Sequence, residues 1–171
     1  MQEVSVIIPN FNGMAYLDGV LAGLECQTVD DFEVILVDNG SSDGSCAFVA
    51  ARYPWVHLIE LPENFGFCKA VNEGIRASRS PYVLLLNNDI EVTDNFIEEM
   101  TDAIKRHPKA FSCAARMIQF HDRDRLDDAG NYYCALGWAY ARGKGKDIHT
   151  YEKEEKIFAS CAGAAIYRKK I

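Results

Sequence analysis

The chain has 171 residues, of which 49% are hydrophobic and 25% are charged, and its formal net charge is −7. This composition is typical of one globular domain with its own core; it excludes a disordered or fibrous chain, and the acidic balance argues against a nucleic-acid partner. No apolar run approaches the ~18 residues that cross a bilayer and no signal-peptide pattern opens the chain, so we expect a cytoplasmic location.

Strand and helix patterns alternate through the first hundred residues. Short apolar runs predict four strands, at residues 4–8, 32–37, 56–61 and 82–86. Apolar residues spaced three and four apart predict three helices with these inner faces: Leu17, Val20, Leu21 and Leu24; Phe67, Ala70, Val71 and Gly74; Ile97, Met100 and Ile104. Thr93 is a candidate cap for the last of them. This alternation predicts an α/β fold, with a mostly parallel sheet flanked by helices.

The second half of the chain has a weaker pattern. Residues 111–120 suggest a strand, residues 121–156 are polar with no clear period, and residues 158–167 turn apolar again. Aromatic side chains in the polar stretch could stack on a sugar ring or form a small apolar cluster: Tyr132, Tyr133, Trp138 and Tyr140. Residues 142–146 hold three basic side chains, which suggests a small basic patch. We expect the six cysteines to be mostly buried, reduced thiols.

Polar clusters follow three of the predicted strands, at residues 9–12, 38–41 and 87–89. Ligands of parallel sheets bind outside the carboxyl ends of the strands, so these clusters predict one binding site. Asp38 could accept a hydrogen bond from a pyrimidine base or a ribose hydroxyl, or it could only stabilise a turn. Asp89 and Asn87 could offer oxygen ligands to a cation that bridges two phosphates, or could only form a turn.

A loop before the second predicted helix adds three candidates. Gly66 would let the backbone approach a ligand, Lys69 would bring positive charge near a phosphate, and Asn64 precedes them. The spacing matches neither a dinucleotide-binding fingerprint nor a P-loop.

Four motifs then follow one another along the chain: V-I-I-P-x-F-N at residues 6–12, V-D-N-G-S-S-D at 37–43, N-x-G-x-x-x-A-x-N-x-G at 64–74 and L-L-N-N-D at 85–89. This order and spacing resemble the family 2 glycosyltransferases with the GT-A fold. Residues 122–130 and 161–165 are similar to the bacterial branch of that family that includes rhamnosyltransferases.

The resemblance implies one GT-A nucleotide-sugar-binding domain over residues 1–171, with a Rossmann-like sheet. Residues 1–108 would be its nucleotide-binding part and residues 109–171 the incomplete start of an acceptor-side part, so we expect a C-terminally truncated, N-terminal portion of an enzyme. That enzyme would be a glycosyltransferase of the hexosyltransferase type. It would move a sugar from a UDP or dTDP donor to a hydroxyl of a glycan or lipid-linked acceptor, with inversion, in cell-surface polysaccharide synthesis. The full-length protein could associate peripherally with the inner face of the membrane.

The resemblance also implies roles for individual residues. The donor-binding set would be Pro9, Phe11, Asn12, Asp38, Asn64, Gly66, Lys69 and Asn88. Asp89 matches the last acid of the family's D-x-D motif and would hold Mg²⁺ or Mn²⁺; Asn87 replaces the first acid and is a weaker ligand. The acceptor side would include Ala162, Gly163 and Ala164. Inverting members use a carboxylate base downstream of such a segment, so we expect the base beyond Ile171 and little transferase activity from this chain alone.

Two other functions are alternatives to this one. A nucleotidyltransferase also uses a parallel sheet and acidic metal ligands, but its first strand is normally followed by a glycine-rich basic loop, whereas residues 9–12 read P-N-F-N. A non-catalytic nucleotide-binding module of the same fold stays open as an alternative.

Overall fold

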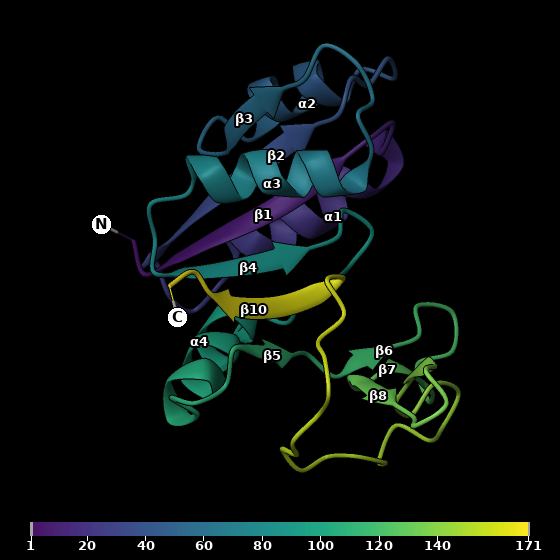
Figure 1. Ribbon diagram of the computed structural model, residues 1–171. Helices are drawn as coiled ribbons and strands as arrows, with labels where there is room; N and C mark the ends of the chain where they lie inside the picture. The colour runs from purple at the N-terminus through teal and green to yellow at the C-terminus, as the bar shows by residue number, and fades with distance from the viewer. Residues whose placement is uncertain (1, 171) are drawn as a thin grey trace.

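The computed structural model describes residues 2–170 and is built around a six-stranded sheet (Figure 1). The strand order is β3-β2-β1-β4-β10-β5. The strands are β1 (Val4–Asn10), β2 (Phe32–Asp38), β3 (His57–Glu60), β4 (Tyr82–Leu86), β5 (Ser112–Ala114) and β10 (Ala164–Arg168). Strands β1 to β4 are parallel, and β10 runs antiparallel between β4 and β5. The predicted α/β fold with a mostly parallel sheet is confirmed.

Four helices cover the two faces of this sheet: α1 (Met14–Glu25), α2 (Ser45–Arg52), α3 (Phe67–Ala77) and α4 (Phe96–Arg106). Helices α1, α2 and α4 share one apolar core with the sheet, and α3 packs alone on the opposite face (Figure 1). Strand β1 is buried on both faces, because Val6 and Ile8 point into the first core and Ile7 into the second. Helix α3 lies so close to the sheet that a Cβ on Gly74 would be 2.5 Å from Ile7.

The inner faces predicted for α1 and α4 are confirmed, and two details of the helices differ. Phe67 is 49% exposed, because it is the first residue of α3 and lies a turn before the residues that reach the sheet. The Thr93 hydroxyl does not cap α4, which begins after Asn95. The side chain of Gln27 does so instead, since its Oε1 accepts the Ile97 N–H at 2.8 Å.

The prediction of a single strand over residues 111–120 is wrong. The segment forms β5 at the edge of the main sheet and then β6 (Met117–Ile118), which pairs with β7 (Leu126–Asp128) in a separate ribbon. A second ribbon joins β8 (Asn131–Tyr133) to β9 (Ala139–Ala141). The chain leaves the main sheet after β5 and returns to it only with β10.

Two expectations about side-chain environments are also wrong. None of the six cysteines is fully buried: all are unpaired thiols, three of them exposed and three half-buried. Arg142 does not join a basic surface patch, since its side chain is 4% exposed and forms an ion pair with Glu155. Its guanidinium lies 4.0 Å from the ring centre of Tyr151. Within residues 2–170, no helix is both long and apolar enough to cross a membrane.

Candidate functional site

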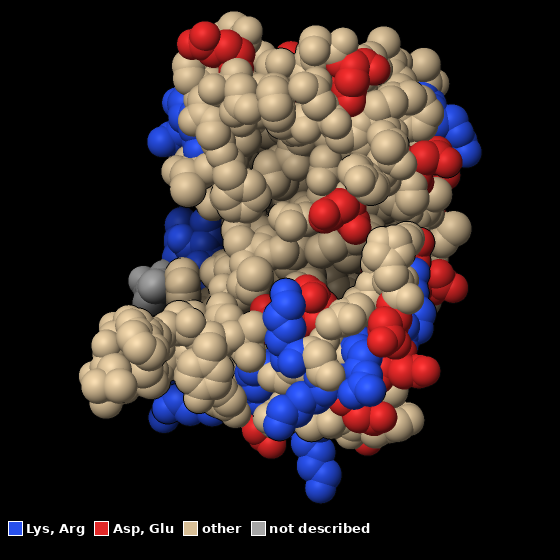
Figure 2. Space-filling view, turned by 90° about the vertical axis from the view of Figure 1, so that its right-hand side faces the viewer, with Lys and Arg blue, Asp and Glu red and all other residues tan. Residues whose placement is uncertain are grey.

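The three polar clusters meet at the edge of the sheet where β1, β2 and β4 end. Because β1 lies between β2 and β4, Asn10 at its end is beside Asp38 in register, and the residues after β4 flank it on the other side. Figure 2 looks onto this edge: the centre of the view is mostly uncharged, and Lys and Arg side chains interspersed with Asp and Glu lie below it. The prediction that these clusters come together is therefore supported by the topology.

A buried hydrogen-bond network ties the strand ends together. Asn10 donates through Nδ2 to Asp38 Oδ1 at 2.8 Å and accepts through Oδ1 from Asn88 Nδ2 at 2.7 Å. Ser41 donates to the same carboxylate twice, from its hydroxyl at 2.6 Å and from its backbone N–H at 2.8 Å. Asp38 is thus the hub of a network that spans β2, β1 and the turn after β4.

The Asp38 carboxylate is held in its charged form. Burial alone would raise its pKa, but the hydrogen bonds from Ser41 and Asn10 outweigh burial and lower the pKa below its ordinary value. Burial and the neighbouring Asp38 raise the pKa of the Cys46 thiol to about 12, so this thiol stays protonated. Asn10 and Ser41 make three hydrogen bonds to Asp38, two to Oδ1 and one to Oδ2, and the Cys46 thiol lies beside the same carboxylate.

The loop after β1 is hydrogen-bonded to the turn that follows β2. Asn12, which has a φ of 50°, donates its backbone N–H to the Ser41 hydroxyl at 2.8 Å and accepts the Ser42 N–H at 2.9 Å. This arrangement leaves the Phe11 ring 47% exposed beside the network, and Pro9 is half-buried. A flat apolar ring at this position can pack against a planar ligand.

Gly13 is a site residue that sequence reasoning missed. A Cβ at this position would lie 2.1 Å from Asn88 Nδ2 and 2.3 Å from Asn10 Oδ1. Its φ is −102°, so its need for glycine comes from this contact and not from backbone conformation. The only sequence signal was a glycine at the end of the polar cluster, directly before a helix.

The loop before α3 is connected to the network through Asn39. Its Nδ2 donates to Asn64 Oδ1 at 2.8 Å, and its Oδ1 accepts the Phe65 N–H at 3.0 Å. Asn64 also accepts the Gly66 N–H at 2.9 Å, which holds the loop in place at the start of the helix. Lys69, by contrast, is paired with Glu73 one turn further along α3 at 2.6 Å. The positive charge expected near a phosphate is therefore not preassembled with the other residues.

The candidate metal ligands and the acceptor-side residues are neighbours. The Asn87 N–H donates to the Gly163 carbonyl at 2.8 Å, and Ala164 is paired with Leu86 across β4 and β10. Asp89 is exposed and makes no side-chain hydrogen bond or ion pair within the described part of the chain, so both oxygens are accessible. No group of three or more His, Cys, Asp or Glu residues within residues 2–170 is placed to hold a metal ion. A cation here would need additional oxygen ligands, such as phosphates and water.

Two curated relatives show comparable levels of similarity to this chain. A cholesterol galactosyltransferase from Borreliella burgdorferi is 29% identical over 121 residues, which is 69% of this chain and 34% of the relative. An N-acetylglucosaminyl-diphospho-decaprenol L-rhamnosyltransferase from Mycobacterium tuberculosis is 30% identical over 116 residues, which is 61% of this chain and 38% of the relative. The alignments therefore span less than half of either relative.

Solved structures confirm the GT-A architecture. S. aureus TarS 1-349 in complex with UDP-GlcNAc has a TM-score of 0.70 at 20% identity, over 99% of this chain and 46% of that one. A mannosyltransferase from Pyrobaculum calidifontis in complex with GDP-Man and Mn2+ has a TM-score of 0.63 at 22% identity, over 67% of this chain and 35% of that one.

The family itself is established by a match along almost the whole chain. The sequence pattern described as Glycosyl transferase family 2 covers residues 5–171. Similarity to the mycobacterial rhamnosyltransferase agrees with the branch that the motifs suggested. The sequence and the fold therefore show that this chain belongs to glycosyl transferase family 2.

Proposed function

We propose that this chain binds the nucleoside diphosphate sugar of a transferase that passes the sugar to a hydroxyl group with inversion. The observation that carries this proposal is the Asp38 network, which joins the ends of β1, β2 and β4 while Asp89 stays open to solvent beside it. Asp38, which its hydrogen bonds hold in place, would bind the base or ribose, and the unpaired carboxylate of Asp89 would bind a metal-bound diphosphate.

The nucleoside would lie along the β1–β2 side of this edge. Pro9 and the exposed Phe11 ring would pack against the base, and Asp38 would accept a hydrogen bond from the base or ribose. UDP and dTDP share a pyrimidine with an imide N–H, which is a donor that a carboxylate can accept. Asn12 and Asn88 would hold the surrounding loops through the contacts already described.

The diphosphate would lie between the loop before α3 and the turn after β4. Asn64 accepts the Gly66 N–H and so shapes that loop. Gly66 has a φ of +86°, which favours glycine, and the space beside it is open, so a phosphate could approach its backbone closely. Lys69 would exchange its half-buried partner Glu73 for a phosphate oxygen, and the exchange would cost little because ion pairs near the surface contribute at most about 1 kcal/mol.

Asp89 and Asn87 fit a divalent cation that shares oxygens with a diphosphate. Mg²⁺ and Mn²⁺ accept one or two protein oxygens when phosphates and water complete the shell, and Asp89 is free to supply one. Such a cation would neutralise the charge that develops on the departing diphosphate. A mannosyltransferase of the same fold has been observed with GDP-Man and Mn2+, which supports this proposal.

The sugar and its acceptor would meet beside β10. Ala162, Gly163 and Ala164 border the strand end that carries Asn87, and their small side chains leave room for a sugar ring. On this view residues 1–108 bind the nucleotide and residues 109–171 begin the acceptor side. The names of the similar cholesterol galactosyltransferase and diphospho-decaprenol rhamnosyltransferase support a lipid or lipid-linked acceptor. The enzyme would act in cell-surface polysaccharide synthesis, at the cytoplasmic face of a membrane.

Titration calorimetry with UDP and dTDP, with and without Mn²⁺, tests this function. We expect the metal to strengthen nucleotide binding, and we expect Asp89→Ala to lose roughly tenfold or more in affinity only when Mn²⁺ is present, about 1.4 kcal/mol or more. Asp94→Ala is the control, because Asp94 is also an exposed acid near the same turn. Identical metal-dependent binding by wild-type chain and Asp89→Ala would contradict the proposal.

A further inference from the structure

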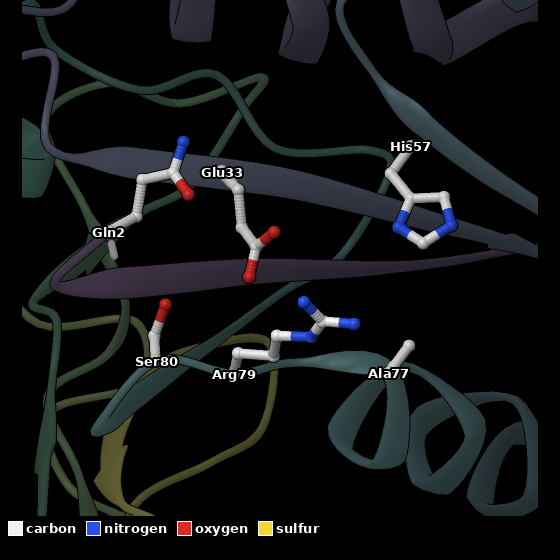
Figure 3. A pocket seen from close by; sticks show the side chains of 6 residues that line it. All are labelled: Gln2, Glu33, His57, Ala77, Arg79 and Ser80. Atoms are coloured by element: carbon white, nitrogen blue, oxygen red, sulfur yellow. The ribbon is translucent and has the colours of Figure 1, made fainter.

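A second candidate site lies at the opposite edge of the sheet from the donor site. A pocket of about 360 Å³, here called the amino-edge pocket, is lined by Gln2, Glu33, His57, Ala77, Arg79 and Ser80. Figure 3 shows side chains from the strands and from the segment after α3 pointing toward one another across it. Glu33 precedes Asp38 by five residues along β2, so the two sites are separated by about 17 Å.

The pocket contains a buried polar group without a partner. The Ser80 side chain is 2% exposed, and its hydroxyl has no hydrogen-bond partner within the described residues. A buried hydroxyl that is left unpaired destabilises the fold, and a ligand hydrogen bond at this position would recover that loss. Arg79 is exposed and makes no side-chain hydrogen bond or ion pair within residues 2–170, so its donors are also available.

The carboxylate of the pocket is held in position by two buried serines. Ser78 donates to the Ser5 hydroxyl at 2.7 Å, and Ser5 donates to Glu33 Oε1 at 2.5 Å. This series of hydrogen bonds orients Glu33 and leaves its Oε2 without a hydrogen-bond partner among residues 2–170. The pocket therefore presents a fixed acceptor in Glu33, a donor in Arg79 and a group that can do both in Ser80.

The balance of charges indicates a neutral, polar ligand. Arg79 and Glu33 offset each other, and the pocket lies at the C-terminal end of α3, where the helix dipole disfavours anions. Apolar ligands are also disfavoured, because Ala77 is the only apolar residue in the lining. A ligand with neighbouring hydroxyl groups can donate to Glu33, accept from Arg79 and do either with Ser80.

We propose that the amino-edge pocket binds a carbohydrate unit distinct from the donor sugar. Its volume is near the lower end of the roughly 300–1,000 Å³ usual for ligand pockets, which suits a single sugar residue. Glu33 Oε2 would accept from one ring hydroxyl, Arg79 would donate to a neighbouring one, and Ser80 would gain its missing partner. The site would hold a glycan at a distance from the donor site.

An NMR titration of the ¹⁵N-labelled chain with methyl α-D-glucopyranoside, methyl α-D-mannopyranoside and N-acetyl-D-glucosamine tests this proposal. At least one sugar is expected to shift the amide signals of Ala77, Arg79 and Ser80 and to leave those of Asn10 and Asn88 unchanged. Arg79→Ala should weaken this binding roughly tenfold, because it removes hydrogen bonds from a charged donor.

Two further variants separate binding from folding. Ser80→Ala should weaken sugar binding without lowering the midpoint of thermal unfolding, because the hydroxyl has no protein partner to lose. Arg76→Ala is the matched control and should bind like the wild type, since Arg76 is an exposed arginine near the same helix end that pairs with Glu73.

Three results with the sugars would overturn the proposal. They are no change of any amide signal with the three sugars, signal changes confined to the edge where β1, β2 and β4 end, or sugar binding that both Arg79→Ala and Ser80→Ala leave intact. A response to inorganic phosphate alone would also overturn it, since the pocket would then be an anion site. Asp89→Ala should keep its sugar binding, so failure here is distinguishable from failure of the proposed donor site.

Discussion

Replacing Asp38 by alanine is expected to lower the free energy of unfolding by about 3 kcal/mol or more. The substitution removes the acceptor of three hydrogen bonds and leaves the Asn10 amide and both Ser41 donors without a partner at a buried position. That loss is a large share of the roughly 5–15 kcal/mol that stabilises a typical domain. Urea unfolding followed by circular dichroism measures it.

Asp30→Ala is the control for this substitution, because Asp30 is an exposed acid just before the same strand. It should change the free energy of unfolding by no more than about 0.5 kcal/mol. UDP affinity should fall for Asp38→Ala under conditions in which the variant is still folded, and it should be unchanged for Asp30→Ala. Equal stability of the two variants would contradict the role of Asp38 as the hub of the network.

The same carboxylate should make stability depend on pH. Its pKa is lowered in the folded chain from an ordinary value of 3.8, so the unfolded chain binds the proton more readily. The stabilisation from Asp38 is therefore fully present above that value and is lost as the pH falls through the lower pKa of the folded state. Asp38→Ala should flatten the acid side of the stability curve relative to wild type. An unchanged acid dependence would contradict the assigned direction of the shift.

Gly13→Ala is expected to have the second-largest effect, destabilising the chain by about 2 kcal/mol and weakening UDP binding. The new methyl group would overlap Asn88 Nδ2 and Asn10 Oδ1, so the turn after β4 must move away from β1. Since Asp89 follows Asn88 directly, the metal ligand would move with it. Calorimetry with UDP and Mn²⁺ measures the loss of affinity.

Gly19→Ala is a matched glycine control in the interior of α1, where a Cβ meets nothing within 4 Å. This substitution should raise stability by about 0.5–1 kcal/mol through helix propensity and leave UDP binding unchanged. If Gly13→Ala bound UDP with wild-type affinity, the hydrogen bond between Asn10 and Asn88 would not be needed for the site.

The sequence was sufficient to predict the four parallel strands of the main sheet and the edge at which the polar clusters meet. Each polar cluster directly follows an apolar run, and parallel strands bring their carboxyl ends together, so Asp38 and the residues after β4 could be placed at one edge. Local periodicity also predicted the buried faces of α1 and α4, because those residues all meet one core.

The contacts within the site depend on partners far apart in the sequence, and this is where prediction failed. Gly13 is needed because Asn88, 75 positions later, occupies the space beside it. Gln27 caps α4 from a different part of the chain, a contact that local capping rules cannot reveal. The pairing of Lys69 with Glu73 is different, because the two residues are four apart on one helix and their opposite charges are visible in the sequence.

Paramagnetic broadening by Mn²⁺ in the presence of UDP tests the central claim most directly, because Mn²⁺ broadens the amide signals of nearby residues. With Mg²⁺ and UDP as the diamagnetic reference, we predict the strongest broadening at residues 87–89 and at Gly163, with weaker effects at residues 10–12. Asp89→Ala should remove this pattern. Broadening centred elsewhere, or the same broadening in Asp89→Ala, would contradict a donor site at the carboxyl edge of β1, β2 and β4.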